Sequence, residues 1–280
     1  MIDVSGPATV APRPRPALPL TAHLAALHAA ADVVATSAAR AGLDAPVPTC
    51  PGWRVADAIA HLGKVHRWAA GNLRADGVRI PGEEEILATV PPEALLVWFA
   101  AGAEDLAGAL REAAPDVDAM VFLADAPPPR EFWARRQAHE SAIHAVDVLS
   151  AALGRFPTAA EADPPHDLAV DGVDELLTGF VGFGLVGLCA EGPCRVAVVP
   201  DNAGPDDLAW LVEVRADGIT TTRGTPASVV EPEQGPPDAV FRGSAAQLYL
   251  GLWNRGEEVR AEGRSDLLER WHARAHVVAG

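Results

Sequence analysis

Four long stretches with the apolar repeat of an α-helix fill the first half of this chain, and they limit the folds open to it. In the first stretch, Leu20, Leu24 and Leu27 recur every three to four residues, which predicts one buried helix face. Connections rich in proline and glycine, such as 46–52, separate the stretches. Residues 77–91 are expected to form a loop, in which the run Glu83-Glu84-Glu85 makes a solvated acidic turn. Helices of this length joined by short and longer connections predict a helix bundle. The predicted helices span residues 20–42, 54–73, 92–113 and 130–153.

The pattern changes from Arg195 onward, where short runs rich in β-branched residues replace the helical repeat. The runs RVAVVP and LAWLVEV predict strands, and ADG followed by GITTTRG predicts a hairpin. The strand-like DAVFRG and the helix-like SAAQLYLGLWNR and SDLLERWHARAHVV follow. The expected fold class is α+β overall, with an all-α bundle followed by a smaller α+β domain.

Three segments follow from these patterns. Residues 1–19 hold five prolines and no apolar repeat, so we expect a flexible tail. A further helix is expected over 167–185, which either closes the first domain or links it to the next. The expected domains are the bundle at 20–190 and an α+β domain at 191–280.

Composition excludes several classes of function. The net charge of −16 argues against a nucleic-acid backbone as partner. The sequence has no long uncharged apolar run and no signal-peptide pattern, so neither a membrane span nor export is expected. Three cysteines make no disulfide framework, which favours a reducing cytoplasm. Cys189 and Cys194 could meet across a turn, but we expect them to be two small buried residues. We expect small-molecule partners and a monomer or homodimer.

An unusual polar stripe marks the segment RRQAHESAIHAVD at 135–147. Glu140 and His144 are four residues apart, so both side chains leave one helix face in the same direction. His139 points about 100° away from Glu140 on a 3.6-residue turn. The stripe places charged residues where a bundle helix should offer Leu and Val. Its members are Trp133, Arg136, Glu140, His144 and Asp147.

Two interpretations of this stripe fit the spacing. His61, in the predicted helix of CPGWRVADAIAHLGKVHRWA, could join Glu140 and His144 as a three-ligand metal site with an open coordination position. An ion pair between Arg136 and Glu140 would also satisfy a buried carboxylate. The spacing alone leaves both open.

The CPGWRVADAIAHLGKVHRW and RRxAHExAxHxVD stretches, with DGVDELL at 171–177, resemble the mycothiol-dependent maleylpyruvate isomerase family. The resemblance covers roughly residues 20–280 and implies a DinB-like four-helix bundle followed by an α+β domain. It implies a divalent metal, usually zinc, held by His61, Glu140 and His144, and the thiol mycothiol as cofactor or co-substrate.

Further site residues are expected around this centre. Arg255, in LWNR, resembles a family element whose Arg serves the active site, so Arg255 first and Arg136 second would hold a substrate carboxylate. Lys64 and Trp68 lie one and two turns beyond His61 and could line the thiol cavity. Asp147 could accept a hydrogen bond from an imidazole N–H. Asp171 and Glu175 fit the family pattern without a physical role that we can assign, and Trp53 is expected to pack in the core.

The expected function is metal-dependent activation of a thiol for cis–trans isomerisation or S-transfer on a small, carboxylated electrophile. Both reactions begin when a thiolate adds to an activated double bond, so the metal motif does not separate them. Two alternatives remain: a non-catalytic metal-containing binding or regulatory protein, and a biosynthetic tailoring enzyme on the same scaffold.

Overall fold

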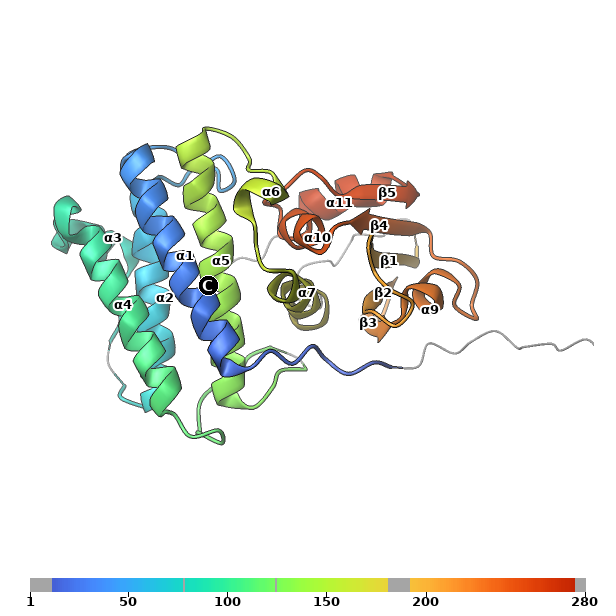
Figure 1. The fold of residues 1–280 in the computed structure, drawn as a ribbon, viewed down its shortest axis with the longest axis horizontal. Coiled ribbons are helices and arrows are strands. Elements are labelled where there is room, and N and C mark those ends of the chain that lie inside the picture. Colours follow the sequence, from blue (N-terminus) through green and yellow to red (C-terminus); the bar gives the residue numbers. More distant parts are fainter. Residues whose placement is uncertain (1–11, 78, 124, 181–191, 275–280) are drawn as a thin grey trace, which may run out of the picture. The chain divides into compact units, whose positions relative to one another are not determined.

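The computed structural model describes residues 12–77, 79–123, 125–180 and 192–274. It divides the chain into two compact units (Figure 1). The first is Leu18–Pro157, which we call the helical unit. The second, which we call the sheet unit, is Thr158–Gly280 together with the residues before Leu18.

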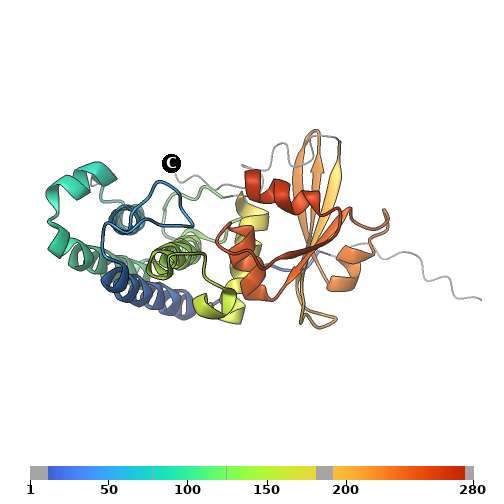
Figure 2. The same ribbon diagram turned by 90° about the horizontal axis from the view of Figure 1, so that it is seen from above.

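The helical unit is a bundle of four long helices, as the sequence predicts. Helix α1 packs mainly against α5, and α2 packs against both α4 and α5. The helices are seen from above in Figure 2. Their bounds are α1 Leu20–Ala41, α2 Val55–Arg74, α4 Pro92–Glu112 and α5 Pro129–Leu153.

Close packing of α2 on α4 depends on a glycine. A Cβ atom built on Gly63 would collide with the indole of Trp98 on α4. The guanidinium of Arg67 lies 3.8 Å from the centre of the same indole. It donates hydrogen bonds to the carbonyls of Trp98 (2.7 Å) and Gly63 (2.8 Å). These contacts fix the helix that carries His61.

One helix of this unit lies where the sequence predicts only a loop. The segment 77–91 contains α3, Glu83–Thr89, whose first turn holds three glutamates. Acidic side chains in a first turn stabilise a helix through its dipole. Ile86 is 1% exposed and anchors α3 in the core.

The sheet unit is built on five strands among the described residues, in the order β3-β2-β1-β4-β5. Strands β1 and β4 are parallel, and the other neighbours are antiparallel. Helix α9, Pro226–Val230, packs on β1 and β2, while α10, Ala245–Leu252, packs on β4 and β1. The chain continues to α11, Asp266–Arg274. The strands are β1 Cys194–Pro200, β2 Ala209–Arg215, β3 Gly218–Gly224, β4 Ala239–Gly243 and β5 Arg260–Gly263. This arrangement confirms the predicted fold class.

The boundary between the two units lies earlier than the predicted one at residue 190. The short helix α6, Ala159–Ala162, and helix α7, His166–Glu175, both belong to the sheet unit. Helix α7 packs on α10 and continues as a π-helical turn, Leu176–Phe180. The predicted helix over 167–185 is therefore present up to Phe180, and its last residues lie outside the described ones.

Two details add to the sequence-based expectations. The Arg13 backbone N–H donates to the carbonyl of Arg223 on β3 (3.1 Å), so the predicted tail contacts the sheet at Arg13, while its flexibility stays a prediction. Cys194 is disulfide-bonded, which corrects the expectation of reduced cysteines at this position, and Cys189 lies outside the described residues. Among the described helices, none combines the length and hydropathy needed to span a bilayer.

Candidate metal centre

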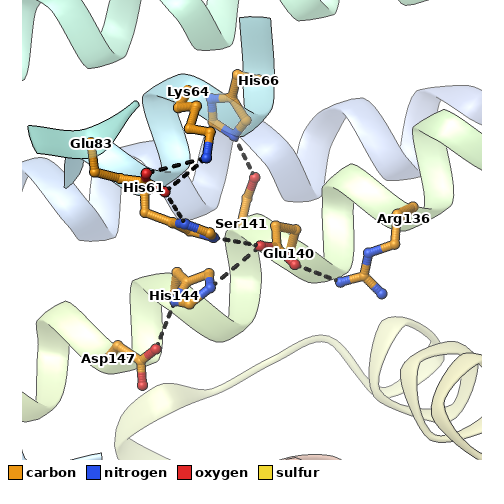
Figure 3. Close-up of polar contacts among 9 residues, drawn as sticks. All are labelled: His61, Lys64, His66, Glu83, Arg136, Glu140, Ser141, His144 and Asp147. Atoms are coloured by element: carbon orange, nitrogen blue, oxygen red, sulfur yellow. Dashed lines mark hydrogen bonds and ion pairs between the residues drawn. The ribbon is translucent and has the colours of Figure 1, made fainter. Parts of the chain in front are cut away.

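Two helices bring three metal-capable side chains to one point in the helical unit. His61 comes from α2, and Glu140 and His144 come from α5 (Figure 3). One donor atom from each lies within 4.8 Å of the others. Glu140 Oε1 is 3.1 Å from His61 Nε2 and 3.4 Å from His144 Nε2. The predicted grouping is therefore present in the structure.

The predicted ion pair is also present, and it does not compete for the same oxygen. Arg136 Nη2 donates to Glu140 Oε2 at 3.0 Å, while Oε1 faces the two imidazoles. Arg136 is 3% exposed, so this contact is shielded from water. The two interpretations of the stripe describe one arrangement in which Arg136 orients Glu140.

Each imidazole has a carboxylate on its Nδ1 side. His144 Nδ1 lies 2.7 Å from Asp147 Oδ2, and His61 Nδ1 lies 3.1 Å from Glu83 Oε1. An ionised carboxylate only accepts, so both Nδ1 atoms act as donors. Their Nε2 atoms are left to face the shared centre. Metal-ligating histidines in proteins show this pattern, because a carboxylate partner fixes the ring and raises its basicity.

The carboxylate behind His144 is itself held in place. Asp147 is fully buried and accepts a second hydrogen bond from Thr49 Oγ1, at 2.6 Å. Thr49 lies 3.0 Å from the hydroxyl of Ser150, which donates to the Asp147 carbonyl. Asp147 therefore accepts a hydrogen bond from an imidazole, as predicted, whereas the contact of Thr49 with Asp147 was not predicted.

Burial and hydrogen bonding shift the pKa values of Glu140 and His144 in opposite directions. Burial alone would lower the pKa of His144, but hydrogen bonds to Asp147 and Glu140 outweigh it and raise the pKa to about 9. Burial would raise the pKa of Glu140, yet hydrogen bonds from His144 and His61 and the Arg136 charge hold it well below its usual value. At neutral pH the metal-free centre therefore carries a proton on His144, which a cation would displace, while Glu140 is ionised.

Aromatic rings flank the centre. The indole of Trp53 stacks on the His144 ring, with centroids 5.5 Å apart and an angle of 11° between the ring planes. It also lies 5.1 Å from the His61 ring. Trp53 packs against the bundle core, as the sequence predicts, but its contacts with both imidazoles were not predicted. It stands before Val55, the first residue of α2, and no local pattern marks it as a site residue.

The two predicted cavity residues occupy different surroundings. Lys64 Nζ donates to both oxygens of Glu83, at 3.1 and 3.2 Å, beside His61. Trp68 is 37% exposed, and its ring meets Trp133 edge-on at 4.9 Å. Lys64 therefore contacts the carboxylate that faces His61, and Trp68 packs in an aromatic cluster further along α2.

The sequence did not predict the contacts of two other residues near the centre, His66 and Glu83. His66 is fully buried and shares a 2.8 Å hydrogen bond with Ser141, the neighbour of Glu140. Burial is the main reason that the pKa of His66 falls to about 3. Glu83 was expected in a solvated acidic turn, and this was wrong, because its carboxylate contacts His61 and Lys64.

Three further predicted residues belong to the sheet unit. Arg255 follows α10, and its Nη1 donates to the Trp253 carbonyl at 2.9 Å. Asp171 and Glu175 lie on α7 and are 1% and 2% exposed. The role of Arg255 stays a prediction, and Asp171 and Glu175 remain without an assigned role.

The donor set suits a divalent cation. Two imidazoles and one carboxylate are the ligands of several catalytic zinc sites, which keep a further position for water or substrate. The carboxylates behind both rings supply the outer hydrogen bonds that such sites use. The residues present therefore fit the metal that the resemblance implies.

Comparisons with known proteins agree with this assignment of fold and family. Residues 24–149 match the model of the mycothiol maleylpyruvate isomerase N-terminal domain. Two solved structures resemble the chain: the mycothiol-dependent maleylpyruvate isomerase (19% identity) and a histidine-to-alanine mutant of such an isomerase (16%). Each has a TM-score of 0.56 and covers 88% of this chain and 93% of its own. No curated protein sequence matches the chain significantly. The helical unit is therefore similar in sequence to the mycothiol maleylpyruvate isomerase N-terminal domain, and the fold of the chain resembles that of the two solved isomerases.

Proposed function

We propose that this protein is a metal-dependent enzyme that activates a low-molecular-weight thiol of the mycothiol type. The observation that carries this proposal is that His61 Nε2, Glu140 Oε1 and His144 Nε2 lie close together. Each of these three side chains also has a hydrogen-bond partner on its other side, namely Glu83, Arg136 and Asp147. The family match of the helical unit supports mycothiol as the thiol.

The chemistry follows from what a bound cation does to a thiol. His61, Glu140 and His144 would hold a divalent cation, of which zinc is our first choice, and its charge would lower the pKa of a thiol bound beside it. The thiolate sulfur forms a bond to one carbon of an electron-poor double bond, whose π electrons move onto the conjugated carbonyl. Rotation about the new single bond and loss of the thiolate give the trans alkene. If a proton reaches the carbanion first, the thiol stays attached and the reaction is an S-transfer.

The residues of the chain would divide the work as follows. His61, Glu140 and His144 bind the cation, and Asp147 keeps the His144 ring oriented. Arg136 is already paired with Glu140, which favours Arg255 as the group that binds a substrate carboxylate. Lys64 and Trp68 are the proposed contacts of the thiol.

Metal content tests the first part. The wild type should bind one divalent ion per chain, and His61→Ala or His144→Ala should lose most of it. His166→Ala, which removes an exposed imidazole at the start of α7, is the matched control and should keep full occupancy, as should His139→Ala. Full occupancy in both ligand variants, measured by elemental analysis, would refute the site.

Thiol binding tests the second part. In the cobalt-substituted protein, mycothiol should produce sulfur-to-metal charge-transfer absorption at lower concentration than glutathione. Conversion of a panel of cis alkenes and other electrophiles then separates isomerase from transferase. Turnover without any spectral response to a thiol would identify a metal-dependent hydrolase instead.

The proposed role of Arg255 has its own test. Arg255→Ala should keep the metal and lose activity toward carboxylated substrates. Arg255→Lys should restore little, because a guanidinium binds a carboxylate through two parallel hydrogen bonds and an ammonium does not. Unchanged kcat/KM in Arg255→Ala would remove Arg255 from the site.

A further inference from the structure

We propose that Glu83, on the short helix α3, is the positioning residue for His61, and that it sets the metal affinity of the centre together with Lys64. This inference rests on the proposed metal site. It concerns an element that the sequence predicts as a solvated loop, and a carboxylate that local periodicity does not connect with either ligand helix.

The geometry supports a direct role. Glu83 Oε1 lies 3.1 Å from His61 Nδ1 on the side of the ring opposite the centre (Figure 3). His61 is 6% exposed, so water has little access to replace this acceptor. The hydrogen bond fixes which nitrogen carries the proton and presents Nε2 to Glu140.

His61 and His144 each have a carboxylate at Nδ1, but the two carboxylates differ in their exposure to water. Asp147 is fully buried and is held by Thr49, whereas the Glu83 side chain is 36% exposed and is held by Lys64. Lys64 shares its ammonium between both Glu83 oxygens and so draws negative charge away from His61. Glu83 should therefore be the weaker and more salt-sensitive of the two second-sphere carboxylates.

The role of α3 follows from this contact. Ile86 packs in the bundle core one turn after Glu83, so the helix holds the carboxylate at a defined place beside α2. The acidic run at 83–85 then has distinct roles: Glu83 faces His61, Glu84 is exposed, and Glu85 pairs with Arg79. Glu84 is consequently a matched control for the charge of the run.

The experiment measures metal affinity directly, by chelator competition with zinc or cobalt on the metal-free protein. Glu83→Ala should weaken affinity by about 10-fold to 100-fold, the usual effect of removing a second-sphere partner. Glu83→Gln should recover part of the loss, because the amide oxygen still accepts from Nδ1 without the charge. Glu84→Ala should leave metal affinity within about twofold of the wild-type value, because this carboxylate does not contact a metal-binding histidine.

A second readout separates positioning from support of the fold. In the zinc-loaded wild type, ¹⁵N NMR of the histidine rings should show that the Nδ1–H of His61 is hydrogen-bonded. In Glu83→Ala this hydrogen bond should be lost, while the chemical shifts of His144 stay unchanged. Lys64→Met should keep this Nδ1–H and keep or raise metal affinity, because it frees the carboxylate from the ammonium.

Each outcome bears on one claim. Glu83→Ala with wild-type affinity and an unchanged His61 signal would overturn the inference and leave the proposed function intact. Lys64→Met with the same loss as Glu83→Ala would also overturn it, since Glu83 would then act only by holding α3. A wild type that binds no metal would refute the proposed function itself.

Discussion

Asp147→Asn gives a quantitative test of how the centre handles protons. The substitution keeps the size of the side chain but removes the charge that faces His144 Nδ1 at 2.7 Å. In the wild type without metal, hydrogen bonds to Asp147 and Glu140 overcome burial and raise the pKa of His144 to about 9. A hydrogen bond to a charged group contributes about 1 kcal/mol more than a neutral one, so Asn should lower this pKa by about one unit.

The sign of the effect follows from linkage. A histidine whose folded pKa is raised stabilises the fold fully below about pH 6.5, its unfolded pKa, and this contribution is lost as the pH rises through about 9. The full difference corresponds to roughly 3 kcal/mol in the metal-free protein. The Asn variant should show a smaller loss of stability over the same range.

Metal affinity should follow the same proton. At pH 7 a cation must displace it from His144, so apparent affinity should rise about tenfold per pH unit until the pH reaches the pKa. In Asp147→Asn the rise should end about one unit lower, and the plateau should be lower because the ring is less firmly oriented.

The assay is an NMR titration of the histidine rings in the metal-free protein, followed by chelator competition from pH 6 to 9. Asp105→Asn is the control, because it makes the same change in an exposed ion pair with Arg74 and should leave the pKa of His144 unmoved. An identical titration of His144 in wild type and Asp147→Asn would refute the reasoning.

Three further predictions concern stability. Gly63→Ala should destabilise the helical unit by about 1–3 kcal/mol, because its Cβ meets the Trp98 ring, whereas Gly108→Ala, with open space around it, should stabilise by up to about 1 kcal/mol; urea unfolding would show both. His66, whose pKa burial lowers to about 3, stabilises the fold above pH 6.5 and should cost up to about 1.4 kcal/mol per pH unit as the pH falls toward 3. Metal-free His66→Gln should therefore show a shallower acid dependence of stability than wild type, and equal slopes would contradict this. Deleting residues 1–17 should lower the melting temperature by only a few degrees, since exposed ion pairs such as Arg13–Asp206 contribute about 0–1 kcal/mol; a loss of cooperative unfolding by calorimetry would disprove it.

Local periodicity was enough to predict the four long helices and part of the site. The helical repeat placed α1, α2, α4 and α5 close to their observed bounds, because each helix buries one face and its sequence shows that face directly. The same periodicity put Glu140 and His144 on one face and Asp147 one turn further along. The spacing left the pairing of His61 with them open, because α2 and α5 are far apart in the chain, and the family resemblance favoured it.

Only the tertiary structure decided which distant residues complete the centre. Glu83 reaches His61 because α3 folds back beside α2, and Thr49 reaches Asp147 from the connection before α2. Helix α7 packs on α10, which moved the boundary between the units to a position that composition does not mark. These contacts join segments far apart in the chain, and their geometry depends on how loops close and helices pack. Sequence periodicity records which face of a helix is buried, but it does not record which neighbour covers that face.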